Sequence, residues 1–179
     1  MPWKNGQGTT VELLKEPIGS SEDFLWRLSK ADVTTDGAFS NFSGYDRTLV
    51  LLTGNGISLE HNNSQSAVLT ESLQFAGFSG ADNTVATLHN GAITDFNVMT
   101  RTGLCSAVVQ TTTTEQHLDT IADEIFIYAV ETTLTIHFAP QNVVTLPAQH
   151  LLRTTDHHKI VCRGGPSIAI TVVHSTRSN

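Results

Sequence analysis

Apolar side chains recur at every second position in several parts of this chain, and this period restricts its fold more than any other feature. Three segments show the alternation with polar neighbours: Val11 and Leu13; Phe24, Trp26 and Leu28; and Leu134, Ile136 and Phe138. Successive side chains of a β-strand point to opposite faces of its sheet, so the alternation predicts strands that are buried on one face.

Other segments are continuously apolar and rich in β-branched residues, which predicts strands buried on both faces. They are Leu49 to Leu52, Ile125 to Val130 and Ile168 to Val173. Turn signals such as Asp36-Gly37, Gly54-Asn55-Gly56 and Asn90-Gly91 separate the apolar segments at short intervals. Many short strands at this spacing are typical of a β-sandwich or β-barrel, so we expect an all-β fold.

The strand pattern stops near Gln110 and resumes at Ile125. Between them, Glu115 to Glu124 places Leu118, Ile121 and Ala122 on one helical face, so this stretch is either a short helix or a connecting loop. We therefore expect residues 1–179 to form one compact unit made of two β-barrel halves, approximately 1–110 and 111–179.

The charge balance excludes several classes of partner. The chain has seventeen acidic and ten basic residues, which gives a formal net charge of −7, and the basic residues are scattered along the sequence. Binding to a phosphate backbone or an acidic membrane surface needs clustered positive charge, so neither nucleic acid nor membrane is expected. No apolar run reaches the roughly 18 to 20 residues of a membrane span, and the N-terminus lacks a secretory signal, so we expect a cytoplasmic protein.

Cys105 and Cys162 are the only cysteines and have apolar or small neighbours. In the cytoplasm we expect both to be reduced packing residues, with a disulfide between them as the less favoured alternative.

Arg27 directly follows Trp26 in an alternating strand, so the two side chains point to opposite faces and one of them must face inward. An inward guanidinium requires an acceptor, either the carboxylate of a ligand or an internal ion pair with Asp36, Asp46 or Glu12.

The segment around residue 97 also has polar side chains that face either a ligand or the solvent. Alternation places Asp95, Asn97, Met99 and Arg101 on one strand face, which suits either the inside of a ligand-binding barrel or the solvent. At the chain start, Trp3-Lys4-Asn5-Gly6 combines an aromatic ring, a cation and an amide with a glycine that lets a ligand approach the backbone. The alternative is a terminus with a chance aromatic residue.

Together these motifs resemble the HutD/Ves family over the N-terminal two thirds of the chain. The motifs are Pro2 to Gly6, Phe24 to Arg27, Asp36 to Arg47 and Asp95 to Arg101. The resemblance implies a double cupin, in which two small jelly-roll barrels are fused, and a link to bacterial histidine utilisation or, for Ves-type members, to cold stress. It assigns ligand binding to the following polar and aromatic positions: Trp3, Lys4, Asn5, Trp26, Arg27, Phe39, Phe42, Asp46, Arg47, Asp95, Asn97 and Arg101, with Phe96 as a further apolar companion.

Metal chemistry is not expected, because the His-x-His pair of metal-binding cupins is absent from the sequence. We expect no cofactor and no catalytic residue.

The leading hypothesis is a metal-free protein that senses or buffers a small anionic intermediate of histidine degradation, such as formylglutamate or urocanate. Arginine and lysine would hold its carboxylate and asparagine its amide or formyl group.

Two alternatives stay open. One is a cupin-fold isomerase or hydrolase acting on a small carboxylate, for which Asp95, Asp46 and His89 are the acid–base candidates. The other is a regulatory protein-interaction module, and pairing of edge strands between two copies would make a homodimer.

Overall fold

The computed structural model describes residues 8–19, 22–119, 121–138, 142–155 and 159–175. Every regular element in these ranges is a β-strand, so the all-β prediction is confirmed. The same ranges accordingly hold no helix with the length and apolarity of a membrane span. Contacts divide the chain into two compact units, Met1–Cys105 (unit 1) and Ser106–Asn179 (unit 2).

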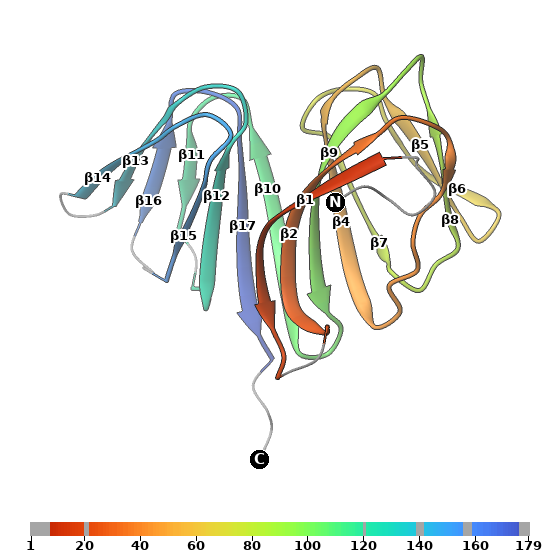
Figure 1. The fold of residues 1–179 in the computed structure, drawn as a ribbon. Coiled ribbons are helices and arrows are strands. Elements are labelled where there is room, and N and C mark those ends of the chain that lie inside the picture. Colours follow the sequence, from red (N-terminus) through yellow and green to blue (C-terminus); the bar gives the residue numbers. More distant parts are fainter. Residues whose placement is uncertain (1–7, 20–21, 120, 139–141, 156–158, 176–179) are drawn as a thin grey trace. The chain divides into compact units, whose positions relative to one another are not determined.

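Unit 1 is built from two antiparallel sheets (Figure 1). The first has five strands in the order β1 (Gly8–Pro17), β2 (Phe24–Val33), β9 (Ile93–Arg101), β4 (Tyr45–Thr53) and β7 (Phe75–Ser79). The second has four, in the order β3 (Gly37–Ala38), β8 (Thr84–Leu88), β5 (Ile57–His61) and β6 (Ser64–Leu69).

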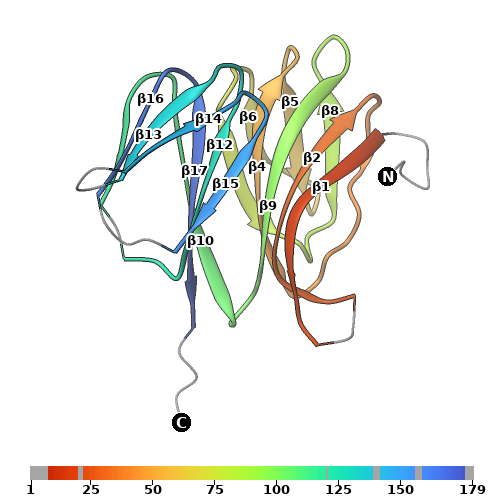
Figure 2. The same cartoon turned by 60° about the vertical axis from the view of Figure 1, so that its left-hand side comes forward.

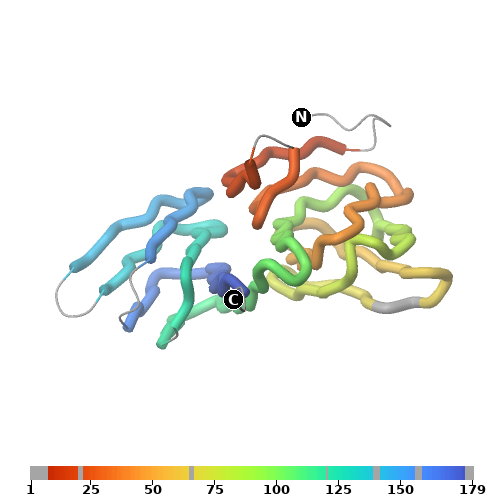
Figure 3. Tube along the Cα trace, turned by 90° about the horizontal axis from the view of Figure 1, so that it is seen from below, coloured from red at the N-terminus to blue at the C-terminus, as the bar shows by residue number. Residues whose placement is uncertain are grey.

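The two sheets of unit 1 enclose an apolar core. Leu49 and Leu51 of β4 pack in one cluster with Ile57 and Leu59 of β5, and all four side chains are fully buried. Seen from below, β1 and β2 lie on one side of this unit and β6 on the opposite side (Figure 3). We call the face of the five-stranded sheet that carries Leu49 and Leu51 its inner face.

Unit 2 also consists of two antiparallel sheets, each of four strands. One has the order β10 (Cys105–Thr112), β17 (Ser167–His174), β12 (Glu124–Ala129) and β15 (Leu151–Thr154), and the other β11 (Gln116–Leu118), β16 (Ile160–Arg163), β13 (Leu134–Phe138) and β14 (Asn142–Leu146). Figure 2 shows these strands from a second direction. Every residue of β12 is buried, as predicted for a continuously apolar strand.

The segment Glu115 to Glu124 was expected to be a short helix or a connecting loop, and in its described residues the structure shows a short strand followed by a loop in place of a helix. Gln116–Leu118 forms β11 and pairs with β16, with Gln116 opposite Cys162. Gln116 and Leu118 are buried and His117 between them is exposed, which is the period of a strand. Ile121 is 89% exposed, so the expected apolar helical face does not exist.

Val11 was expected on the buried face of its strand, and this prediction is wrong because its side chain is 58% exposed. Two features explain the difference. β1 is an edge strand of its sheet, and the register with β2 shifts between Glu12 and Leu14, so a bulge interrupts the alternation at Leu13.

Both cysteines are buried and no disulfide joins them, in agreement with their interpretation as packing residues. The thiol of Cys105 donates to the Leu25 carbonyl at 3.0 Å. Burial raises the pKa of Cys162 to about 11, so this thiol stays protonated at neutral pH.

The loop between β3 and β4 carries Phe39 and Phe42, and backbone hydrogen bonds with Gly80 fix its position. The Phe42 amide donates to the Gly80 carbonyl at 2.8 Å, and the Gly80 amide donates to the Tyr45 carbonyl at 2.8 Å. A Cβ atom at position 80 would lie 2.3 Å from the Phe42 carbonyl oxygen. The close approach of the two backbones therefore requires glycine here.

Gly80→Ala should lower the free energy of unfolding by about 1–3 kcal/mol, the usual cost of overpacking a tight contact. Urea denaturation monitored by tryptophan fluorescence would measure it. Gly77→Ala is the matched control in β7, because a Cβ there would meet only the Arg47 carbonyl oxygen at 3.8 Å. Equal stabilities of the two variants would show that the loop does not depend on this contact.

Candidate ligand-binding site in unit 1

Two arginines flank the central strand of the five-stranded sheet. Arg27 of β2 and Arg47 of β4 both pair with Met99 of β9, one from each side. Paired residues of an antiparallel sheet point to the same face, so all three side chains share one face. Leu49 lies two residues after Arg47 and belongs to the core of unit 1. Both guanidinium groups are therefore on the inner face.

Arg47 is enclosed by aromatic rings and is only 9% exposed. The carbon at the centre of its guanidinium lies 5.4 Å from the ring centroid of Phe39, 5.5 Å from that of Phe42 and 4.9 Å from that of Phe78. Nη1 donates to the Ser40 carbonyl at 3.4 Å. Burial lowers the pKa of Arg47 to about 10, against the opposing effect of Asp95, so the group remains a cation at neutral pH.

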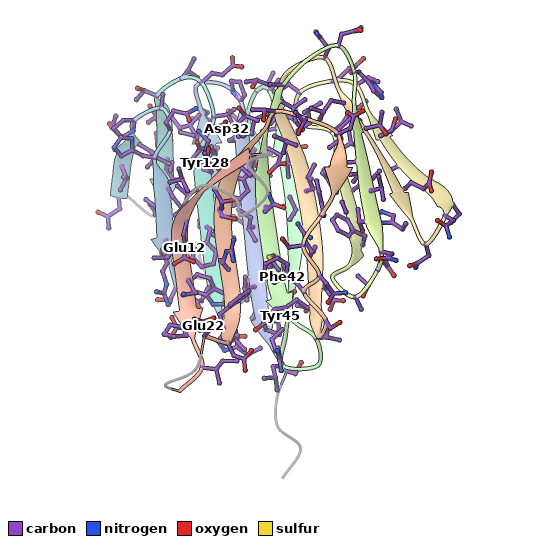
Figure 4. All side chains as sticks on the ribbon, turned by 45° about the vertical axis from the view of Figure 1, so that its right-hand side comes forward. Glu12, Glu22, Asp32, Phe42, Tyr45 and Tyr128 are labelled. Carbon is purple, nitrogen blue, oxygen red and sulfur yellow. The ribbon has the colours of Figure 1, made fainter. Side chains whose placement is uncertain are left out.

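Arg27 occupies the equivalent position on the other side of β9, and its side chain is 18% exposed. Its guanidinium carbon lies 5.8 Å from the ring centroid of Phe24 and 5.7 Å from that of Phe42. The ring of Phe42 therefore contacts both guanidinium groups. Figure 4 shows Phe42 at the same end of this sheet as Tyr45, with Glu12 on β1.

The Nε atoms of Arg27 and Arg47 are buried without a hydrogen-bond partner among the described residues. The carboxylate nearest to Arg27 in the described ion pairs is that of Glu12, whose Oε2 lies 3.8 Å from Nε, too far for a hydrogen bond. Asp36, Asp46 and Glu12 were the expected internal partners of Arg27, and Glu12 is the one that lies near it. At 3.8 Å, however, Glu12 does not accept a hydrogen bond from the Nε–H group. Burial lowers the pKa of Arg27, and Glu12 opposes this effect.

Asn97 connects Arg47 to a buried carboxyl group. Its Oδ1 accepts from Nη2 of Arg47 at 3.3 Å, and its Nδ2 donates to Asp95 Oδ1. Each end of the amide thus makes one hydrogen bond to a protein group, and Asn97 links Arg47 to Asp95. The predicted polar row on β9 does face inward, since Asp95 is 1% and Asn97 7% exposed.

Burial raises the pKa of Asp95 to about 7, although the charge of Arg47 and the hydrogen bond from Asn97 both favour the carboxylate. Asp32 adds a smaller repulsion in the same direction as burial. The proton occupancy of Asp95 is therefore sensitive to any change of charge beside Arg47.

Arg101 belongs to a neighbouring cluster. Its Nη1 lies 3.4 Å from Asp23 Oδ1, and its guanidinium carbon lies 4.9 Å from the ring centroid of Tyr45. The Tyr45 hydroxyl donates to the same Asp23 oxygen at 3.2 Å, and the Tyr45 ring stacks on Phe24 at 4.3 Å. Arg101 thus supports Phe24, which in turn contacts Arg27.

Two other predicted positions lie away from the inner face of this sheet. Trp26 is fully buried on the face of β2 opposite Arg27, and Asp46 is exposed on the face of β4 opposite Arg47. Lys4, with its neighbours Trp3 and Asn5, lies outside the described residues. Phe24 and Phe78 were not predicted, because nothing in the sequence shows which rings meet the arginines across strands.

In the described parts of the chain, no group of three or more His, Cys, Asp or Glu side chains could hold a metal ion.

Comparison with known proteins places the chain in a family. A family model described as HutD matches residues 1–170. The chain belongs to the HutD family. A Pseudomonas putida relative, an uncharacterized 21.2 kDa protein in the hutC 3′ region, is 32% identical over 90% of this chain and 84% of its own length. Its location links HutD proteins to a histidine-utilisation locus.

Protein Ves of Escherichia fergusonii is 41% identical to this HutD-family chain over 109 residues, which are 60% of the chain and 56% of Ves. The structure of HutD from Pseudomonas fluorescens SBW25, in a formate condition, has a TM-score of 0.86 at 27% identity and covers 98% of this chain and 93% of that one.

A cupin 2 conserved barrel domain protein from Leptotrichia buccalis has the same fold, with a TM-score of 0.59 at 8% identity over 98% of this chain and 92% of its own. The double-cupin prediction for this HutD-family chain is confirmed.

Asp95→Asn should change how stability depends on pH. A carboxyl group whose pKa rises from 3.8 to about 7 on folding stabilises the fold in its protonated form. That contribution is complete below pH 4 and is lost as the pH rises through 7. The unfolding free energy of the variant should therefore improve relative to wild type across this window and then level off.

Urea denaturation at a series of pH values would measure this difference. Asp46→Asn, which removes an exposed carboxylate from the opposite face of β4, is the control for loss of one surface charge. A constant difference between Asp95→Asn and wild type from pH 4 to pH 8 would contradict the assignment.

Proposed function

We propose that this HutD-family protein binds a small carboxylate metabolite in unit 1, with Arg27 and Arg47 as the anion-holding residues and without a metal ion. The observation that carries the proposal is the pair of inner-face guanidinium groups on either side of Met99, each with a buried Nε that lacks a hydrogen-bond partner among the described residues.

A bound carboxylate would complete the hydrogen bonding of this cluster. Leaving a buried donor without a partner costs about 1–3 kcal/mol, and more when the group is charged. Guanidinium groups bind carboxylates through two parallel hydrogen bonds, and the Nε–H is one of the donors used. The ligand would therefore recover free energy that the unliganded fold gives up.

The aromatic rings specify the remainder of the ligand. Phe42 contacts both arginines, while Phe39 and Phe78 surround Arg47. Rings in this arrangement suit a flat or short apolar stem attached to the carboxylate. Urocanate and formylglutamate, both anions of histidine degradation, have this form, and the family's link to a histidine-utilisation locus favours them. Reversible binding of either one would allow sensing or buffering of the intermediate.

Asp95 supports a second candidate, a cupin-fold enzyme acting on the same carboxylate. A pKa of about 7 suits a general acid or base at neutral pH. Turnover of urocanate or formylglutamate by wild type, lost in Asp95→Asn while binding persists, would favour the enzyme over the receptor.

Arg27→Gln and Arg47→Gln should each weaken binding of urocanate or formylglutamate by roughly 10- to 100-fold, the range for hydrogen bonds to a charged group. Isothermal titration calorimetry would measure this. Arg163→Gln is the matched control, since it removes the same charge from an exposed arginine of unit 2 that pairs with Glu115. Absence of binding to wild type, or equal loss in all three variants, would refute the proposal.

A further inference from the structure

The inner faces of unit 1 change from apolar to polar along their strands. On β4 the inward residues run from Leu51 through Leu49 to Arg47. On β5 of the facing sheet they run from Ile57 through Leu59 to His61, and all three are buried. The partners of these β5 residues on β8 follow the same gradient from Leu88 and Ala86 to Thr84. Each sheet thus ends in buried polar side chains.

Phe78 joins the two polar ends. It pairs with Arg47 in the five-stranded sheet, and its ring centroid lies 4.9 Å from the guanidinium carbon. The same ring stacks on the imidazole of His61, with 4.7 Å between centroids and 30° between planes. His61 on one sheet and Arg47 on the other therefore contact a single aromatic ring.

The His61 imidazole is held in a fixed orientation. It is 7% exposed, and its Nδ1 lies 2.7 Å from the Thr84 hydroxyl oxygen. That hydroxyl can donate or accept, so Nε2 is a hydrogen-bond acceptor in one tautomer and a donor in the other. Because Nδ1 is engaged by Thr84, Nε2 is the ring nitrogen that would meet a ligand.

We infer that His61 forms a hydrogen bond, through Nε2, with a second polar group of the ligand whose carboxylate is held by Arg27 and Arg47. The inference rests on the proposed function and narrows it. The ligand class is a carboxylate with a hydrogen-bonding group at the far end of a stem that lies along Phe78, such as an imidazole or a formamide. A plain short-chain carboxylate would fill only the arginine end.

A second histidine, directly after β8, makes a similar contact with a hydroxyl group and serves for comparison. His89 Nε2 lies 2.7 Å from the Ser58 hydroxyl oxygen, the same separation as in the His61–Thr84 pair. Ser58 is on the outward face of β5, since it alternates with the buried Ile57 and Leu59. The histidine–hydroxyl bond is common to both pairs, and only His61 also faces Phe78 and the arginine cluster.

The test compares full ligands with truncated ones. Acrylate is urocanate without its imidazole, and glutarate is formylglutamate without its formamide. The double variant His61→Phe with Thr84→Val keeps the ring and removes both hydrogen-bonding partners, which avoids leaving a buried group unpaired. The matched control is His89→Phe with Ser58→Ala, which alters the outward pair in the same way.

In calorimetric titrations, the His61 double variant should bind the full ligand more weakly by roughly two- to tenfold, the range for one hydrogen bond, and bind the truncated anion as wild type does. The control variant should match wild type with both ligands. Arg47→Gln should weaken full and truncated ligands alike. Melting temperatures of all variants would establish that each is folded.

A measurement on wild type is independent of variant folding. The imidazole ¹⁵N resonances of His61, assigned by their loss in the double variant or in His61→Gln, should shift on addition of urocanate or formylglutamate and shift much less with the truncated anion. Those of His89 should stay in place.

The outcomes separate the two claims. If neither urocanate nor formylglutamate binds to wild type, the proposed function fails and the role of His61 fails with it. If either one binds and Arg47→Gln weakens it, but the His61 double variant keeps the preference for the full ligand and the His61 resonances do not move, only the role of His61 is overturned.

Discussion

The burial of the Arg47 guanidinium on the inner face of a β-sheet is the constraint on which the candidate site depends. A cation in that position requires compensation, and three phenylalanine rings, one carbonyl and the amide of Asn97 supply part of it. The rings explain why the β3–β4 loop must lie close to the sheet, and that close approach explains why position 80 is glycine. The described protein groups supply no hydrogen-bond acceptor for the Nε–H group of Arg47, so its compensation is incomplete.

The same constraint shapes the electrostatics of the strand next to Arg47. Asp95 is near enough to favour the charge on Arg47, yet burial raises the pKa of the carboxyl group itself to about 7. The positive charge of Arg47 is therefore only partly balanced at neutral pH, and Arg27 lies on the same face across Met99. A protein with net charge −7 thus concentrates two cations where an anion could meet both.

The site is assembled from strands that are distant in sequence, and its chemistry follows from their pairing. β2, β4 and β9 bring the two arginines, Asn97 and Asp95 to one face, while β7 adds Phe78, which touches His61 of the facing sheet. A double-cupin fold sets such a row of inward side chains inside each barrel and leaves their identity to the sequence. This freedom is how one architecture can host metal chemistry in some proteins and anion recognition, as proposed here, in another.

The sequence by itself determined the strand class and the faces of individual strands, because a period of two is a local property of the backbone. It therefore placed Trp26 opposite Arg27, and Asp95 and Asn97 on one face, correctly. The pattern was less reliable at Val11, where a bulge breaks the period, and at Gln116–Leu118, where the strand has only three residues. Only the tertiary structure decided that Arg47 faces inward with Arg27, that Asp46 does not, and that Arg101 pairs with Asp23. Those outcomes depend on which strands become neighbours and in which register, and long-range pairing leaves no mark in the local sequence.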